Sequence, residues 1–222
     1  MDVSLTEENY LKAIFSINLL NGDEGVSTNE LSEHLNNKAG SVTDMLKRLS
    51  EKKLVNYEKY KAVHLTAKGR KLALNIVRKH RLWEVFLTEK LKFGWDEVHE
   101  IAEQLEHIKS EELVRRLDTF LGHPEFDPHG DPIPNDKGEL REVKARPLNR
   151  VKTSGTFIFT GVAEHSQVFL RHLTSIGLRI GDRIRVEELN TYDRSVKIKI
   201  GKQESRYISE KVSANILVEL KK

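Results

Sequence analysis

Histidine and carboxylate residues recur at helical spacing between residues 78 and 109, and this pattern limits what the chain can fold into and bind more than any other. At about 100° per residue, the apolar residues of the stretch 98–108 fall on one side of a helix. Four polar residues fall together on the adjacent side, within an arc of about 100°: His99, Glu103, Glu106 and His107. In the preceding predicted helix, His80 and Glu84 are four residues apart and therefore share a face.

Imidazole and carboxylate groups that converge from two helices offer nitrogen and oxygen ligands, which suit a borderline or hard divalent metal ion. The simpler alternative is that these glutamates lie on solvated helix faces and that each histidine is satisfied by a neighbour. Taken one at a time, the residues do not separate the two interpretations. For the set, several ligand types in one arc with few cations to pair them favour a metal site.

The chain has 222 residues, which is enough for two or three small domains, and its 38% hydrophobic and 32% charged residues are typical of a globular protein. No apolar run approaches the roughly 18 residues that a membrane-spanning helix needs. Residues 1–4 lack the basic and apolar segments of a signal peptide, so we expect a cytoplasmic protein with no membrane partner. The absence of cysteine excludes disulfides, thiolate catalysis, iron–sulfur clusters and cysteine-type zinc sites.

Charge is strongly segregated along the chain, although the net charge is only +3. The net charge is −6 over residues 1–35, +10 over 36–81, −9 over 82–142 and +8 over 143–222. A basic block directly before an acidic block indicates polyanion binding beside cation binding.

The first 70 residues have the pattern of a winged helix-turn-helix. Three helices and two short strands are predicted, over residues 6–20, 27 to about 35, 40–52, 54–58 and 62–66. Thr6 is the candidate N-cap of the first helix, and Ser27 with Glu30 forms a capping-box pattern at the second. The short second helix and the tight turn would present the third helix to a major groove of DNA.

The residues expected to contact DNA belong to the exposed start of the third helix and to the wing: Lys38, Gly40, Ser41, Thr43, Asp44, Lys59 and Lys61. A winged helix that serves only as a protein-interaction module is the alternative. The net charge of +10 over residues 36–81 favours DNA.

Three further helices are predicted, over residues 68–90, 95–108 and 110–121. Their apolar faces exceed what a short bundle can bury alone, which indicates a homodimer interface. The segment 122–134 breaks helical order with four prolines. We therefore expect His123 and His129 to lie in an ordered extended loop rather than to bind metal.

The C-terminal part is predicted to be a separate unit of short strands with a helix over residues 166–176, typical of a small SH3-like β-barrel. Its positive charge could indicate RNA binding, but no aromatic pair lies where bases would stack. The expected fold class is α+β and multidomain. Its predicted parts are a winged-helix domain over 1–70, a helical metal-binding and dimerisation domain over 71–140, a linker over 141–152 and an SH3-like domain over 153–222.

The whole chain resembles the diphtheria toxin repressor family of metal-dependent transcriptional regulators, which has iron- and manganese-responsive members. The motifs that carry the resemblance are Arg78-Lys79-His80-Arg81-Leu82-Trp83-Glu84, the helix from Val98-His99 to Glu106-His107, and Gly130-Asp131-Pro132-Ile133-Pro134. The resemblance implies the three-domain form, with a FeoA-like C-terminal domain. It also implies a homodimer that binds a double-stranded DNA operator and holds Mn²⁺ or Fe²⁺ at two sites per subunit.

The resemblance assigns ligands to both sites. One site would be completed from the C-terminal domain through a Glu-x-x-Gln pattern, and its ligands would be His80, Glu84, His99, Glu164 and Gln167. The other, regulatory site would include a residue of the first helix, and its ligands would be Asn9, Glu103, Glu106 and His107.

The sequence departs from the family's pattern in the first helix. Iron-responsive members have Met at the position of Asn9 and Cys at that of Glu103. Manganese-responsive members have Asp and Glu there, with a further Glu where this chain has Lys12. Oxygen and nitrogen ligands without sulfur favour Mn²⁺ or Fe²⁺ over softer metals. Lys12 argues against a second manganese ion in the regulatory site.

We therefore predict a metal-activated DNA-binding repressor that controls metal-ion homeostasis, and not an enzyme. Two other classes stay open. A metal-independent winged-helix regulator would bind DNA equally well without metal. A Glu/His metallohydrolase would need an open coordination position and a substrate cleft.

Overall fold

The computed structural model describes residues 3–151 and 154–220. Its contacts divide the chain into two compact units. The first unit consists of Met1–His80, Gln104–Glu111 and Pro134–Leu140, and the second of Arg81–Glu103, Glu112–Ile133 and Arg141–Lys222. Lys152 and Thr153, where the predicted linker ends and the predicted C-terminal domain begins, lie outside the described residues. Among the residues described, no helix combines the length and apolar character needed to cross a membrane.

The first two helices of the first unit are both set by capping boxes. Helix α1 (Leu5–Leu20) begins after Ser4, whose hydroxyl accepts from the Glu7 N–H at 3.3 Å while its own N–H donates to the Glu7 carboxylate at 2.8 Å. The prediction of Thr6 as N-cap was wrong, because Ser4 has the glutamate three residues further on. Helix α2 (Thr28–His34) is capped by Ser27 and Glu30, as predicted.

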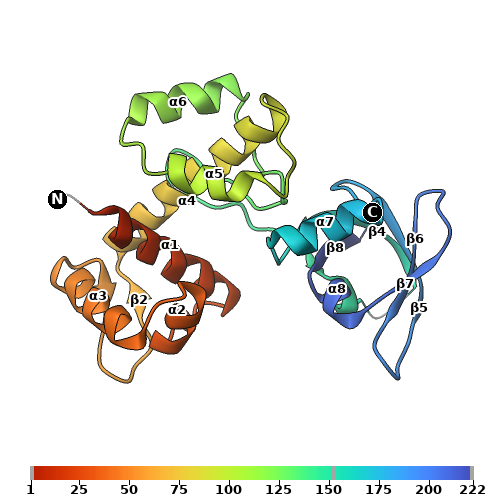
Figure 1. Cartoon of the computed structure of the whole chain (residues 1–222), viewed down its shortest axis with the longest axis horizontal. Helices are drawn as coiled ribbons and strands as arrows, with labels where there is room; N and C mark the ends of the chain where they lie inside the picture. The colour runs from red at the N-terminus through yellow and green to blue at the C-terminus, as the bar shows by residue number, and fades with distance from the viewer. Residues whose placement is uncertain (1–2, 152–153, 221–222) are drawn as a thin grey trace. The chain divides into compact units, whose positions relative to one another are not determined.

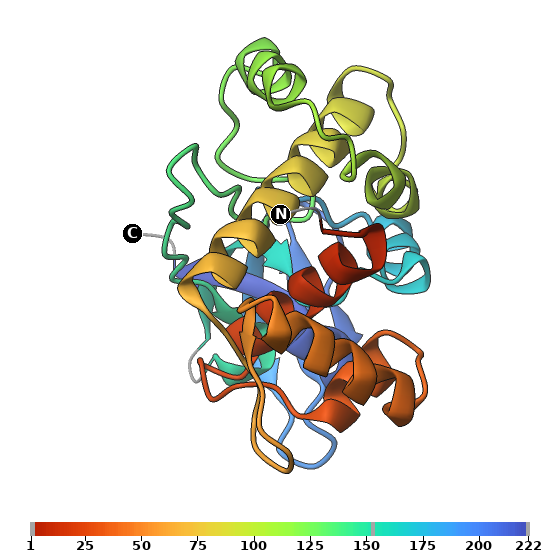
Figure 2. The same ribbon diagram turned by 90° about the vertical axis from the view of Figure 1, so that its left-hand side faces the viewer.

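A third helix and a small hairpin complete the winged helix. Helix α3 (Ala39–Glu51) is followed by strands β1 (Val55–Asn56) and β2 (His64–Leu65), which pair antiparallel. Figure 2 shows this hairpin as a narrow loop beside the helices. The core beneath consists of fully buried aliphatic side chains, among them Leu11, Ile14, Leu31, Leu46, Leu49 and Leu54. The winged-helix prediction is confirmed.

Three helices follow the wing. Helix α4 (Ala67–Glu89) is long and continuous (Figures 1 and 2), and α5 (Val98–Leu105) and α6 (Glu111–Phe120) are shorter. Helix α5 begins later than predicted because residues 95–97 form a turn, in which the Glu97 N–H donates to the Gly94 carbonyl at 2.9 Å. In the second unit, Leu82 and Val85 of α4 pack with Leu117 of α6.

The C-terminal part is a six-stranded antiparallel sheet in the order β3-β8-β4-β5-β6-β7, which confirms the predicted SH3-like fold (Figure 1). The strands are β3 (Arg146–Pro147), β4 (Gly155–Val162), β5 (Arg183–Leu189), β6 (Val196–Ile200), β7 (Arg206–Ile208) and β8 (Ile216–Leu220). Helices α7 (Gln167–Ser175) and α8 (Glu210–Ala214) accompany them. Phe157 and Phe159 of β4 are fully buried in its core.

Part of the stretch expected to be a linker is structured. Strand β3 pairs with β8, with Arg146 opposite Val218, and a 3-10 helix (Leu148–Arg150) follows it. Leu148 is fully buried in the core of the C-terminal sheet. Residues 146–151 therefore belong to the C-terminal fold, because a buried leucine ties them to it.

Candidate metal centre and nucleic-acid interface

Glu84 of α4 lies at the centre of a buried acidic and imidazole cluster in the second unit. Its carboxylate lies 3.5 Å from Nδ1 of His99 and 3.7 Å from Nδ1 of His129. Ligand atoms of Glu84, Asp127 and His129 lie within 4.8 Å of one another, and all three side chains are buried. His80 precedes Glu84 by one turn of α4, so the two share a face of that helix, as the sequence predicted.

The electrostatics of this cluster suit a cation. Burial and the charges of Asp131 and Glu84 raise the pKa of Asp127 to about 7. Burial alone would lower the pKa of His129, but the hydrogen bond and charge of Glu84 outweigh it and raise the pKa to about 9. The metal-free cluster therefore retains protons near neutral pH, and a divalent cation could replace them.

His165 brings the C-terminal sheet to the same cluster. Its ring lies edge-on to His129 with centroids 4.9 Å apart, and its Nε2 lies 3.6 Å from Oδ2 of Asp131. That Nε2 is buried without a hydrogen-bond partner among the described residues. An orphaned buried imidazole nitrogen beside carboxylates fits a ligand that awaits a metal ion.

The two residues predicted for this role lie differently. Glu164 accepts from the Ser166 hydroxyl at 2.6 Å and from the Asn215 amide at 3.1 Å. Gln167 is the exposed first residue of α7. The structure thus brings His165, rather than Glu164 or Gln167, to the cluster.

Three residues of this cluster were absent from the predicted ligand set, among them His129, for which an ordered extended loop was the preferred interpretation. Asp127, His129 and Asp131 come from the proline-rich loop, where no periodicity marks an inward face. Hydrogen bonds hold the loop closed, since Oδ1 of Asp127 accepts from the His129 N–H at 2.8 Å and from the Asp131 N–H at 3.0 Å. Nδ1 of His123 lies 2.7 Å from Oδ2 of Asp118.

A second cluster lies in the first unit around Glu106, whose side chain is fully buried. Nδ1 of His80 lies 2.5 Å from its carboxylate, and Lys12 of α1 donates to it at 2.8 Å. Nearby, Nδ1 of His107 lies 2.6 Å from the carboxylate of Glu8. Helix α1 therefore supplies Glu8 and Lys12 to this region, two residues that the predicted ligand set did not include.

Two features of the second cluster bear on metal binding. Oδ1 of Asn9 is buried and has no hydrogen-bond partner among the residues described, which fits its predicted role as a ligand. Burial would raise the pKa of Glu106, but the hydrogen bond with His80 and the charge of Lys12 outweigh it and lower that pKa. Glu103, the other predicted ligand, is half exposed and lies 3.6 Å from His99.

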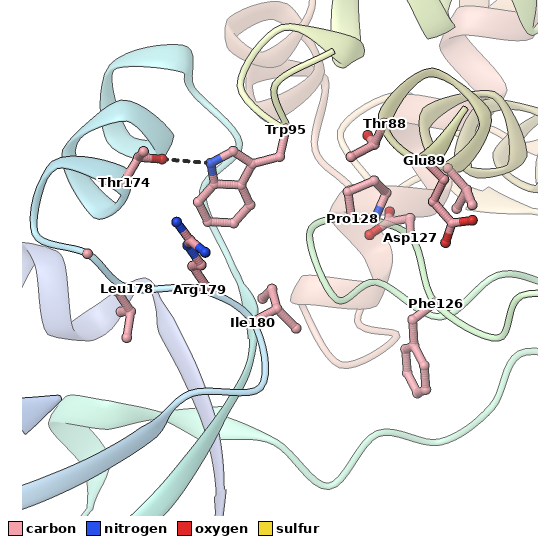
Figure 3. Close-up of a pocket in the computed structure, with 12 residues that line it drawn as sticks. Thr88, Glu89, Trp95, Phe126, Asp127, Pro128, Thr174, Leu178, Arg179 and Ile180 are labelled. Carbon is pink, nitrogen blue, oxygen red and sulfur yellow. Dashed lines mark hydrogen bonds between the residues drawn. The ribbon is translucent and has the colours of Figure 1, made fainter. Parts of the chain in front are cut away.

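A pocket of about 450 Å³ borders the first cluster, with Asp127 in its wall (Figure 3). Its other walls are largely apolar, from Val85, Trp95, Phe126, Pro128, Leu178 and Ile180. The Trp95 indole donates to the Thr174 hydroxyl at 2.9 Å and stacks on His129 with ring centroids 6.1 Å apart. Asp127 is thus shared between the buried cluster and the lining of this pocket.

The predicted DNA contacts gather on exposed parts of the winged helix. At the start of α3, Lys38, Gly40, Ser41 and Asp44 are exposed and Thr43 is half-buried. No side chain caps this helix start, so its free N–H groups are available to a phosphate. In the wing, Lys59 and Lys61 are exposed; Lys61 pairs with Glu58 at 2.5 Å, and Lys59 lies over the Tyr60 ring at 4.8 Å.

Comparison with known proteins accounts for nearly the whole chain. Residues 2–63 match the iron dependent repressor N-terminal DNA binding domain, 66–135 its metal binding and dimerisation domain, and 146–220 the FeoA domain. A solved manganese-dependent transcriptional repressor in complex with manganese is 33% identical, with a TM-score of 0.85 over 96% of this chain and 98% of that one. The chain belongs to the diphtheria toxin repressor family.

Other members of the family are similarly related. The manganese regulator SloR is 34% identical with a TM-score of 0.79, over 97% of this chain and 98% of that one. The iron-dependent repressor IdeR of Mycobacterium bovis is 35% identical over 131 residues, which are 58% of this chain and 55% of IdeR. The chain thus spans about half the length of the curated relatives it matches.

Proposed function

We propose that this protein is a metal-activated, DNA-binding transcriptional repressor that acts as a cytoplasmic homodimer and controls metal-ion homeostasis. The observation that carries the proposal is the buried cluster of Glu84, Asp127 and His129 in a chain that also contains a winged helix. Arg81 lies 3.6 Å from Asp127 and 3.1 Å from Asp131 and offsets part of their charge. The cluster still offers carboxylate oxygens and imidazole nitrogens within 4.8 Å of one another, which is a ligand set that suits a divalent ion.

We assign two metal sites to each subunit. The first would combine the predicted residues with those that the structure adds: His80, Glu84, His99, Asp127, His129 and His165. The second would use Asn9, Glu103, Glu106 and His107. Nitrogen and oxygen ligands favour Mn²⁺ or Fe²⁺ in both, and solved relatives include a repressor in complex with manganese.

Residues of α1 would couple metal binding to DNA binding. A bound metal supplies positive charge, which neutralises Glu106 and its neighbours. Asn9, on α1, would then fix that helix against the residues 104–111 within the first unit. If the DNA-competent arrangement binds metal more tightly than the other, metal shifts the population toward it. The start of α3 would read bases and the wing lysines would contact phosphates.

Trp95 provides a direct test of the first site, because it stacks on His129. The chain has two tryptophans, so Trp83→Phe leaves Trp95 as the only reporter. In that background, Mn²⁺ should quench the fluorescence, and Glu84→Gln should weaken the apparent affinity at least tenfold. Glu89→Gln, an exposed change on the same helix, is the matched control. Equal quenching curves for both variants would exclude Glu84 as a ligand.

DNA binding separates the proposal from its alternatives. Selection of duplexes from a random pool in Mn²⁺, Fe²⁺, Zn²⁺ or EDTA should enrich a sequence only with an activating metal. Enrichment in EDTA equal to that in metal would instead support a metal-independent regulator. Turnover of an ester or phosphate substrate with bound Mn²⁺ would support the metallohydrolase.

Limited proteolysis tests whether His165 binds the metal of the first site. At saturating Mn²⁺, His165→Ala should increase proteolysis within residues 136–151, because the sheet loses its ligand to the cluster. The double change Glu164→Ala and Gln167→Ala tests the assignment made from the resemblance. If the double variant is cleaved faster than the wild type and His165→Ala is cleaved at the wild-type rate, the metal ligands are Glu164 and Gln167 rather than His165.

A further inference from the structure

One face of the C-terminal sheet is strongly basic. Side chains alternate along β5 and β6, and Ile184, Val186, Ile198 and Ile200 are buried in the core. Glu187 and Glu188 follow Val186 on β5, and the other residues that flank these buried positions toward the outer face are cationic: Arg183, Arg185, Lys197 and Lys199. We call these four residues the basic sheet face. Figure 1 shows β5 and β6 as neighbouring strands that extend into a long hairpin.

The strand register sets two of these cations against each other. Arg185 lies directly opposite Lys199 in the antiparallel ladder. Side chains opposite each other have Cβ atoms about 5 Å apart, and like charges in such a pair are destabilising. An anionic partner would relieve this repulsion.

Carboxylates offset the charge at one end of the face only. Glu188 lies opposite Lys197, and the Tyr207 hydroxyl donates to Glu188 at 2.9 Å. Within residues 154–220, no carboxylate lies at ion-pair distance from Arg183, Arg185 or Lys199. The neighbours of Arg183 and Arg185 on β4 are Ile158 and Thr156, which are uncharged. The unneutralised part of the face therefore comprises Arg183, Arg185 and Lys199.

We propose that the basic sheet face binds the phosphate backbone of double-stranded DNA as a second contact, beyond the winged helix. Charge complementarity supports a polyanion, and the block 143–222 carries a net charge of +8. Binding of a single strand relies on bases stacked on aromatic rings. On the neighbouring strand β7, the ring of Tyr207 is engaged by Lys197 at 5.7 Å and its hydroxyl by Glu188, and Tyr192 in the loop between β5 and β6 is a single exposed ring. Backbone contact to a duplex, which needs charge and no stacking, is the mode that fits.

The inference rests on the proposed function, since the winged helix would bring the duplex to the protein. The test uses the full chain with Mn²⁺ and a fluorescein-labelled 40-base-pair duplex of mixed sequence, titrated by anisotropy over a NaCl series. Arg185→Gln with Lys199→Gln should flatten the slope of log affinity against log salt by about 1.8, because each phosphate contact contributes about 0.9. Lys144→Gln with Lys211→Gln is the matched control; both lysines are exposed in the same part of the chain and lie outside the face, and the slope should not change.

Three further measurements make the outcome decisive. The melting temperature of Arg185→Gln with Lys199→Gln should equal or exceed that of the wild type, because the change removes repulsion. DNA should protect Lys199, but not Lys144 or Lys211, from acetylation in a mass-spectrometric footprint. Lys59→Ala with Lys61→Ala tests the winged helix separately.

Two results together would overturn the second contact: a salt slope that Arg185→Gln with Lys199→Gln leaves unchanged, and acetylation of Lys199 that DNA does not reduce. If Lys59→Ala with Lys61→Ala still flattens the slope, the proposed function stays intact. No binding of any duplex by the wild type with Mn²⁺, Fe²⁺ or Zn²⁺ would overturn both.

Discussion

Lys12 supplies positive charge to the buried carboxylate of Glu106, so the effect of its replacement on stability should be measurable. Its ammonium group lies 2.8 Å from the carboxylate of Glu106, which is fully buried, and the Lys12 side chain is 16% exposed. Lys12→Met keeps the aliphatic stem and removes the charge. The buried carboxylate then retains the imidazole of His80 at 2.5 Å. We expect the variant to fold and to be less stable without metal.

The size of the loss follows from burial. Removal of one partner from a fully buried ion pair costs about 3–5 kcal/mol. Because His80 stays in place and Lys12 is partly solvated, we expect about 2 kcal/mol for Lys12→Met. For a chain of this length each kcal/mol shifts the melting temperature by about 2–4 °C, which gives a fall of roughly 4–8 °C.

Metal should reverse this loss. At a free concentration about 100 times Kd, a ligand specific for the folded state adds about 2.7 kcal/mol of stability. A cation at the second cluster would replace the charge that Lys12→Met removes, so Mn²⁺ should stabilise the variant more than the wild type. Differential scanning fluorimetry in EDTA and in Mn²⁺ measures both shifts.

The control is Lys47→Met, which breaks the exposed pair with Asp44 at 3.2 Å and should change stability by at most about 1 kcal/mol. Equal melting temperatures of Lys12→Met and the wild type in EDTA would refute the stabilising role of Lys12. The replacement of its charge by metal is refuted if Mn²⁺ raises both melting temperatures equally.

Three other outcomes are expected. At His129 (pKa about 9) and Asp127 (pKa about 7) the folded protein in EDTA binds protons that the unfolded chain has released, so stability should fall as pH rises from about 7 to 9. Burial lowers the pKa of His165, so that residue opposes the trend only below this range. Urea titrations at saturating Mn²⁺ should not show the fall. Asn9→Asp should tighten Mn²⁺ binding in calorimetry by adding a charge, whereas weaker binding would remove Asn9 from the site. Gly130→Ala should destabilise the protein by more than about 2 kcal/mol in chemical denaturation, because Gly130 has φ +89° and a Cβ there would lie 2.0 Å from a β4 carbonyl oxygen. At Gly138, with φ +76°, a Cβ would meet only the Leu74 side chain at 3.9 Å, so Gly138→Ala should cost only about 1 kcal/mol.

Local rules were sufficient to predict the helices and the winged helix. The Ser27–Glu30 capping box and the apolar periodicity of α3 are encoded within a few residues of sequence, so they could be identified without tertiary information. The N-cap of α1 was misplaced because Ser4 and Thr6 are both good caps. The choice depended on the reciprocal bond with Glu7.

The parts of the site that come from irregular segments could not be predicted in this way. His129 lies in a proline-rich loop whose closure depends on contacts with β4, since the Val162 N–H donates to the His129 carbonyl at 3.0 Å. His165 and Glu164 are adjacent in sequence, and only the fold decides which of them faces Asp131. Spacing along the chain identifies ligands on one helix, whereas ligands in loops depend on tertiary contacts between distant segments.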